Sequence, residues 1–209
     1  MGILNKGIFG GFVNKTGPLV GRNVKGQNLI TGLHYKSNKK ISIAQQNQNL
    51  KLKFIVEFLK PIKSLIASGY KHVAKKGIAF NEAVSYNFQF AVIGSGGIYD
   101  IDYSAVLYSK GGLAGPLNPN VSFIDFDSLA FTWQLTNHCD YDDEATFLVY
   151  NEDLKLFAAS INAVKRSKCE YLMELPPKFI PGKLHCYMSF QSRKFKKVSN
   201  SIYVGKLIL

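Results

Sequence analysis

The second half of the chain contains a series of short strand-like segments, and these limit the possible folds more than any other feature. Between residues 121 and 204, turn residues separate Val121–Ile124, Leu129–Leu135, Ala145–Tyr150, Leu156–Ser160, Cys169–Leu175, Leu184–Phe190 and Ser201–Val204. In the second segment, Phe131 and Trp133 alternate with polar neighbours, which is typical of a half-buried antiparallel strand. Short strands at this spacing predict a β-sandwich of fibronectin type III or immunoglobulin-like type over residues 98–209.

Two further features refine this sandwich prediction. The single tryptophan, Trp133, lies on the second of these strands, and Tyr187 lies within the sixth, where it is a candidate corner tyrosine. A further strand is expected at Ile101–Ser109. The Gly- and Pro-containing stretch Gly111–Asn120 is expected to be a connector.

A helical region, residues 42–97, is predicted before the sandwich. One apolar stripe recurs at four-residue spacing, at Leu50, Phe54, Phe58 and Ile62. Pro61 is expected to kink this helix, which covers residues 42–68, and Gly69 to end it. A second helix is expected at Asn81–Ile93, although apolar residues there also alternate as they would in a strand.

The charge of the chain is concentrated at one end. The net charge of its 209 residues is +12, but residues 1–77 contain fourteen Lys or Arg and one acidic residue, Glu57. The remaining residues contain twelve basic and thirteen acidic side chains. A region this one-sided repels itself unless counter-ions or an anionic partner screen it. A merely solubilising surface usually mixes both signs, so the charge pattern favours an anionic partner.

Residues 1–41 form a basic, glycine-rich arm that is expected to be extended or looped, because glycine destabilises a helix by about 1 kcal/mol per residue. Apolar residues between the glycines indicate that this arm lies against the protein's own body, another subunit or a polymer. The candidate residues for binding nucleic acid or another anion are Lys15, Arg22, Lys25, Tyr35, Lys36, Lys39 and Lys40. Basic side chains neutralise phosphates, and a tyrosine ring can stack on a base.

No motif indicates catalysis, a cofactor or a resident metal. Gly94–Gly97 lacks the Lys-Ser/Thr ending of a phosphate loop, so a linker is expected there. The four histidines share no metal-ligand spacing, and there is no nucleophile elbow. The acidic stretch 140–144 is expected to be a solvated turn. Calcium binding, or docking onto the basic arm of a neighbouring copy, is the alternative.

The three cysteines have no paired spacing, which favours free thiols in a reducing compartment. No stretch approaches the ~20 apolar residues of a membrane span, and the N-terminal sequence lacks the features of a secretory signal. We therefore expect a cytoplasmic protein, or one carried within a phage-like particle, with no membrane partner.

Several motifs, in order along the chain, resemble one known family. They are Gly7-Ile-Phe-Gly-Gly-Phe-Val-Asn-Lys15, Gly17-Pro-Leu-Val-Gly21, Lys53-Phe54, Phe58-Leu-Lys-Pro61, Ala83-Val-Ser-Tyr-Asn87, Asn118-Pro119 and Val198-Ser-Asn-Ser-Ile-Tyr-Val-Gly205. Together they resemble a family of uncharacterised Bacteroidota proteins that is known only as a domain of unknown function. Asn49 departs from the pattern, since relatives tend to carry an Arg near there. The resemblance implies a shared fold and a bacterial source, and it implies no activity.

Two functional hypotheses follow from the sequence. In the first, the protein is a non-enzymatic binding protein whose basic N-terminal third engages nucleic acid or another polyanion. In the second, it is a structural component of a phage-like particle or another assembly, and the arm laces into acidic surfaces of neighbouring subunits. A homo-oligomer is compatible with both hypotheses. Nothing in the sequence favours an enzyme.

Overall fold

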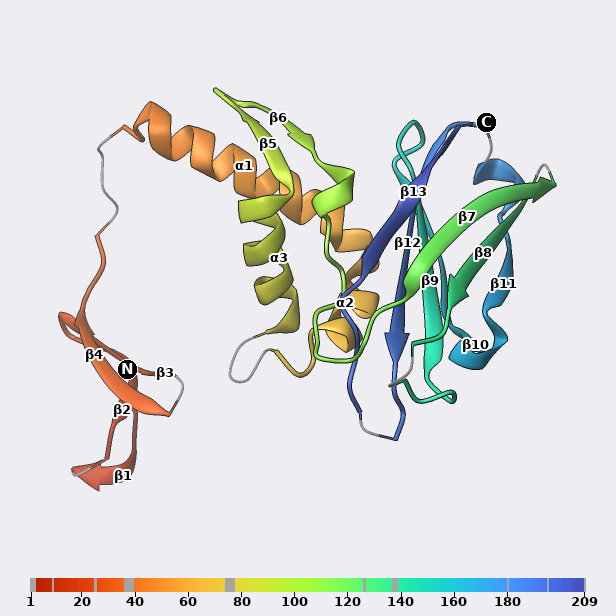
Figure 1. Ribbon diagram of the computed structural model, residues 1–209. Coiled ribbons are helices and arrows are strands. Elements are labelled where there is room, and N and C mark those ends of the chain that lie inside the picture. The colour runs from red at the N-terminus through yellow and green to blue at the C-terminus, as the bar shows by residue number, and fades with distance from the viewer. Residues whose placement is uncertain are drawn as a thin grey trace. The chain divides into compact units, whose positions relative to one another are not determined.

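The protein is mainly β, and it divides into two compact units, Met1–Ser42 and Ile43–Leu209 (Figure 1). The computed structural model describes residues 3–8, 10–24, 26–35, 40–73, 78–125, 127–136, 139–179, 181–194 and 196–208. The basic arm falls in the first unit. The second unit contains both the predicted helical region and the predicted sandwich.

The first unit is a four-stranded antiparallel sheet in which each strand pairs with the next along the chain. Its strands are β1 (Ile3–Ile8), β2 (Phe12–Thr16), β3 (Leu19–Val24) and β4 (Gln27–Gly32). Two of the recurring glycines, Gly17 and Gly26, lie at its turns. There they adopt positive φ angles of 57° and 84°, which glycine reaches without steric cost. The expected extended arm is therefore folded into hairpins.

Two other glycines let the chain of this sheet cross closely over itself. A Cβ atom on Gly21 would overlap the carbonyl oxygen of Phe12, and one on Gly11 would overlap the side chain of Asn28. Where burial is described in this unit, only Gly21 is fully buried. Apolar side chains such as Ile30 remain exposed. The described part of the sheet therefore has no hydrophobic core of its own.

The predicted first helix is confirmed and is broken at the proline. It consists of α1 (Ile43–Leu59), the 3-10 turn η1 (Lys60–Ile62), which contains Pro61, and α2 (Lys63–Gly69). Helix α3 (Ala79–Phe90) confirms that the second apolar pattern is helical. It ends earlier than predicted, because Val92 already belongs to a strand.

The segment after α3 differs from its prediction. Strands β5 (Val92–Ser95) and β6 (Ile98–Ile101) form a hairpin, so Gly94–Gly97 contributes to its strands and its turn. The predicted strand Ile101–Ser109 is wrong, because β6 ends at Ile101 and the 3-10 turn η2 (Tyr103–Ala105) follows.

The backbone after η2 pairs with no strand, and side chains from distant parts of the chain make hydrogen bonds to it instead. The amide of Asn87 on α3 bonds both the N–H and the C=O group of Leu107, each at 2.9 Å. Ser201 accepts a hydrogen bond from the N–H group of Tyr108 at 3.0 Å. These long-range contacts satisfy backbone groups that would otherwise require a neighbouring strand.

The predicted sandwich is confirmed, and its strands agree closely with the sequence segments. The strands are β7 (Leu117–Asp125), β8 (Ser128–Gln134), β9 (Glu144–Asn151), β10 (Leu156–Lys165), β11 (Glu170–Glu174), β12 (Lys183–Gln191) and β13 (Ile202–Ile208). Short 3-10 turns are η3 (Arg166–Lys168) and η4 (Pro177–Phe179). One sheet has the order β7-β8-β11 and the other β10-β9-β12-β13, all antiparallel. This three-plus-four order is that of a fibronectin type III-like sandwich.

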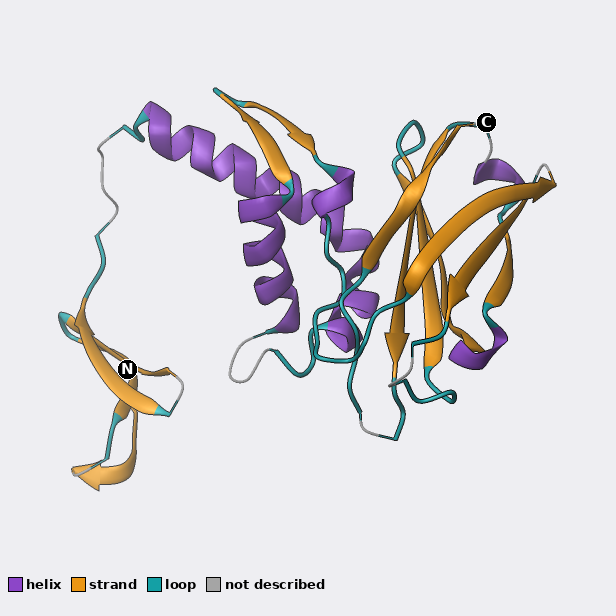
Figure 2. Cartoon of the chain, in the orientation of Figure 1, coloured by secondary structure: helices purple, strands orange, loops and turns teal. Residues whose placement is uncertain are grey.

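The four-stranded sheet is covered on both faces. Its inner face packs Phe147 and Met188 against Trp133 of the other sheet, whereas its outer face places Leu148 and Tyr187 in one core with helix residues. The second unit is therefore layered as helices, sheet and sheet (Figure 2). Double coverage explains why β9 and β12 are buried along almost their whole length and show no clean alternation of apolar and polar residues.

The corner-tyrosine prediction for Tyr187 is wrong. Its hydroxyl donates to the carbonyl oxygen of Tyr103 at 2.7 Å. Tyr103 belongs to η2, on the helix side of the sheet. A corner tyrosine instead bonds backbone a few residues upstream at a corner of the sandwich. The helical layer uses this tyrosine to fix η2 against the sheet.

Candidate anion-binding surface

Strand register places two of the predicted anion-binding residues on one face of the N-terminal sheet. Lys15 of β2 lies opposite Val20 of β3, and Arg22 lies two residues beyond Val20 on the same strand. Residues two apart on a strand share a face, so Lys15 and Arg22 are diagonal neighbours, roughly 7–8 Å apart at their Cα atoms. Both side chains are exposed. Two like charges at this separation favour an anion between or above them.

The other predicted arm residues are described only in part. Tyr35 is 83% exposed and Lys40 is exposed, both after β4. The predictions for Lys25, Lys36 and Lys39 fall outside the described residues. The structure therefore brings Lys15 and Arg22 together and leaves the grouping of the other five untested.

Most of the described lysines of the helical region have no carboxylate partner in the second unit. Lys53 pairs with Glu57 at 3.8 Å, but both side chains are largely exposed and such a pair is worth little. Lys51 lies over the ring of Phe88 at 4.6 Å, a contact that leaves its charge intact. Among the described side chains of residues 43–73, those without a carboxylate partner in their own unit are Lys51, Lys60, Lys63 and Lys71, and the first unit, Met1–Ser42, contains no Asp or Glu.

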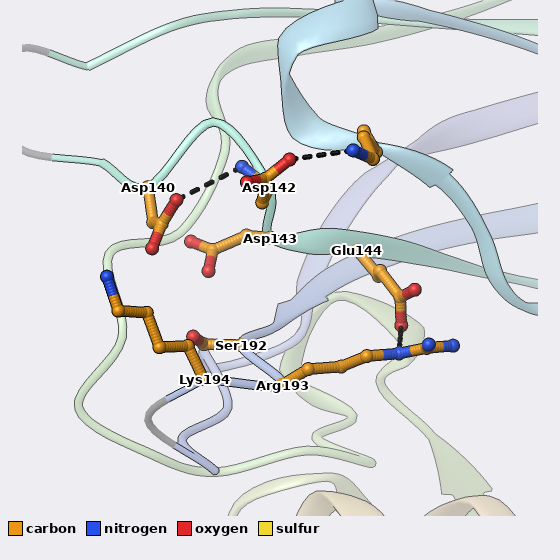
Figure 3. A pocket seen from close by; sticks show the side chains of 8 residues that line it. Asp140, Asp142, Asp143, Glu144, Ser192, Arg193 and Lys194 are labelled. Atoms are coloured by element: carbon orange, nitrogen blue, oxygen red, sulfur yellow. Dashed lines mark hydrogen bonds and ion pairs between the residues drawn. The ribbon is translucent and has the colours of Figure 1, made fainter.

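The acidic stretch 140–144 lines a hollow of about 340 Å³ (Figure 3). Basic side chains neutralise it: Lys165 bonds Asp142 at 2.7 Å, and Arg193 bonds Glu144 at 2.8 Å. In the parts of the chain that the structure describes, no group of three or more His, Cys, Asp or Glu side chains is placed to hold a metal ion. Two of the four carboxylates of the stretch are therefore paired with exposed basic side chains.

One ion pair behind this hollow is fully buried and has a structural role. The Arg166 guanidinium is inaccessible to solvent and lies 3.5 Å from a carboxylate oxygen of Asp143. It donates to the carbonyl oxygens of Ala114 and Gly115 at 2.8 and 2.9 Å. Burial raises the pKa of the Asp143 carboxyl, although hydrogen bonding to Ser192 and the charge of Arg166 oppose this. Arg166 thus ties η3, directly after β10, both to the connector before β7 and to the residue before β9.

The structure also forms a hollow that sequence reasoning missed, between the helices and the outer face of the four-stranded sheet. It brings Phe58 of α1 together with Tyr150 of β9 and Phe157 of β10. In the sequence these residues read as separate apolar positions on a helix and two strands. No local spacing marks them, because the site exists only once the helix packs on the sheet.

The fold and this surface define a fibronectin type III-like sandwich with a helical layer and a basic N-terminal sheet. None of the described helices is long and apolar enough to cross a membrane. The chain belongs to a family of unknown function, DUF6266, whose family model matches residues 10–205. This confirms the predicted resemblance to an uncharacterised family. No curated protein matches the chain.

Proposed function

We propose that this is a non-enzymatic binding protein whose basic N-terminal third, residues 1–77, engages nucleic acid or another polyanion. The observation that supports this proposal is the scarcity of carboxylates within the units that carry these charges. The first unit, Met1–Ser42, contains no Asp or Glu, and among the described basic side chains of residues 43–73 only Lys53 has a carboxylate partner within the second unit. A phosphate backbone supplies the missing negative charge, and release of its counter-ions drives the association.

The face that carries Lys15 and Arg22 is suited to a phosphate backbone. Arg22 presents a planar fork of donors, which matches the oxygens of a phosphate. Tyr35, with its ring largely exposed, is available to stack on a base. In this proposal the sandwich positions the basic sheet or recruits a second partner, in the cytoplasm or within a phage-like particle.

A second candidate function is assembly, with the N-terminal sheet lacing into acidic surfaces of neighbouring subunits in a phage-like particle or another assembly. The exposed apolar side chains of this sheet favour it: Leu19 is 44% exposed, Leu29 41% and Ile30 61%. Because the described part of this sheet has no hydrophobic core, covering these apolar side chains would stabilise it. A neighbouring subunit would provide such a cover.

Binding to a labelled DNA duplex across a salt series tests the first proposal. The slope of log affinity against log salt is about −0.9 per phosphate contact on duplex DNA. Replacing Lys15 and Arg22 together by Glu is expected to reduce the slope by about 2 units. Replacing Lys36, Lys39 and Lys40 by Glu is expected to abolish binding without changing the melting of the sandwich.

The matched control replaces two exposed lysines of the sandwich unit, Lys168 and Lys197, by Glu, which changes the net charge equally. This control is expected to leave the slope unchanged. An equal loss in the control would mean that overall charge, and not the basic third, attracts the DNA. No DNA binding, together with large homogeneous assemblies in light scattering, would favour the second candidate.

A further inference from the structure

A hollow of about 460 Å³ lies between the helical layer and the outer face of the four-stranded sheet. Its volume falls within the range of small-molecule sites. The walls come from three distant parts of the chain: α1 with η1, β6 with η2, and the β9–β10 hairpin. All three parts belong to the second unit, so the hollow is independent of the basic sheet.

Aromatic rings form the apolar walls of this hollow. The ring of Phe58 meets Tyr150 and Phe157 edge-on, with centroid distances of 5.1 and 5.3 Å, and Tyr150 lies 4.6 Å from Phe157. Phe58 and Phe157 are only partly buried. Because each ring is held by the others, the walls are formed before any ligand arrives.

A carboxylate, Glu152, is held at the edge of the same hollow. His185 contacts it at 3.3 Å, and the ammonium groups of Lys183 and Lys206 lie 3.7 and 3.8 Å away. Behind it the His185 ring stacks on Tyr103 with a centroid distance of 3.8 Å. Burial alone would raise the pKa of Glu152, but the hydrogen bond with His185 and the two lysines bring it below its ordinary value. Glu152 is therefore a fixed, ionised acceptor.

The charges around the hollow exclude a strongly charged ligand. Glu57, Asp100 and Glu152 line it together with Lys155. Ion pairs bring Lys53 against Glu57, and two further lysines against Glu152. The three carboxylates are nearly balanced by the four nearby lysines, so the wall selects neither a cation nor an anion strongly. A compensated carboxylate still accepts hydrogen bonds, because its two oxygens offer about four lone-pair sites.

These features match a neutral molecule with one apolar face and many hydroxyl groups. We propose that the hollow between α1 and the β9–β10 hairpin binds a neutral sugar ring of a glycan. The C–H face of the sugar packs on the rings of Phe58 and Phe157. Its hydroxyls donate to Glu152 and Asp100 and accept from Lys155. This site goes beyond the proposed polyanion binding, because no residue of the N-terminal sheet contributes to it.

Saturation-transfer NMR on the full chain tests this site, with maltose, cellobiose and N,N′-diacetylchitobiose as probes at about 10 mM. We expect transfer to the C–H protons of at least one disaccharide. Phe157→Ala and Glu152→Gln are each expected to weaken binding about tenfold, since each removes one wall or one acceptor. Tyr141→Ala and Glu174→Gln, at exposed positions outside the hollow, are the matched controls and should leave binding unchanged.

Three results would overturn the proposal. The first is no transfer to any of the three disaccharides by a folded protein. The second is binding that Glu152→Gln, which is nearly isosteric, leaves unchanged. The third is displacement of the bound sugar by an equal concentration of tetramethylammonium, because the hollow would then select a cation. The Lys15→Glu, Arg22→Glu variant should keep full sugar binding, so failure of the polyanion proposal is distinguished from failure of this one.

Discussion

Replacing Arg166 by Met tests whether the buried guanidinium holds the sandwich unit together. Methionine keeps the apolar stem but removes every donor. The variant leaves the carbonyl oxygens of Ala114 and Gly115 without their partners and leaves the buried Asp143 carboxylate without its counter-charge. It also removes the contact of the guanidinium with the Phe190 ring, 4.2 Å from its centroid.

The expected loss of unfolding free energy is large. Removing one partner of a buried ion pair costs about 3–5 kcal/mol, because the remaining charge stays buried. Each orphaned carbonyl could add about 1–3 kcal/mol, but neighbouring contributions are not additive. We therefore expect a loss of about 3–5 kcal/mol, out of a total stability of about 5–15 kcal/mol. The melting temperature should fall by on the order of 10 °C.

Urea unfolding followed by Trp133 fluorescence measures this loss directly. Trp133 is the only tryptophan of the chain, and its ring nitrogen donates to the carbonyl oxygen of Arg166 at 2.9 Å. Lys168→Met, an exposed change in the same turn, is the control and should be nearly neutral. Adding Asp143→Asn to Arg166→Met should recover about 1 kcal/mol or more, because the uncompensated charge is gone. A loss below about 1 kcal/mol in the single variant, or a further loss in the double variant, would refute the reasoning.

Three further predictions follow from the geometry. Gly21→Ala is expected to open the N-terminal sheet to limited proteolysis, because its Cβ would overlap a backbone carbonyl, whereas Gly32→Ala should be harmless, since nothing lies within 4 Å of its Cβ. Tyr187→Phe removes the bond to the Tyr103 carbonyl and should cost about 1 kcal/mol in urea unfolding. Burial lowers the pKa of His185, so the unfolded state binds its proton more tightly and stability should fall as pH drops below about 6.5. The melting temperature of His185→Gln should depend less on pH in that window, and an unchanged dependence would contradict this assignment.

Local patterns predicted the elements whose formation depends on neighbouring residues. The alternation around Phe131 and Trp133 predicted β8 (Ser128–Gln134) to within one residue at each end. The four-residue spacing of apolar side chains predicted α1, and the proline predicted the break in it. These predictions were correct because the spacing of apolar side chains along a strand or helix is set by residues close together in the sequence.

Local patterns failed where distant segments decide the outcome. Ile101–Ser109 has strand-like apolar residues, but β6 ends at Ile101, and the side chains of Asn87 and Ser201 bond the backbone of Leu107 and Tyr108 where a strand would have paired. The sequence pattern indicates a corner tyrosine at Tyr187, but its side chain faces the helical layer. In both places, residues far away in the sequence supply the deciding contact.

By itself, the sequence determined the sandwich, the kinked helix and the concentration of positive charge in residues 1–77, since periodicity and composition are local quantities. Only the tertiary structure decided that Lys15 and Arg22 share a face. Likewise, only the tertiary structure brings Phe58, Tyr150 and Phe157 around one hollow. Strand register and the packing of the helices on the sheet set these proximities, and neither leaves a pattern in consecutive residues.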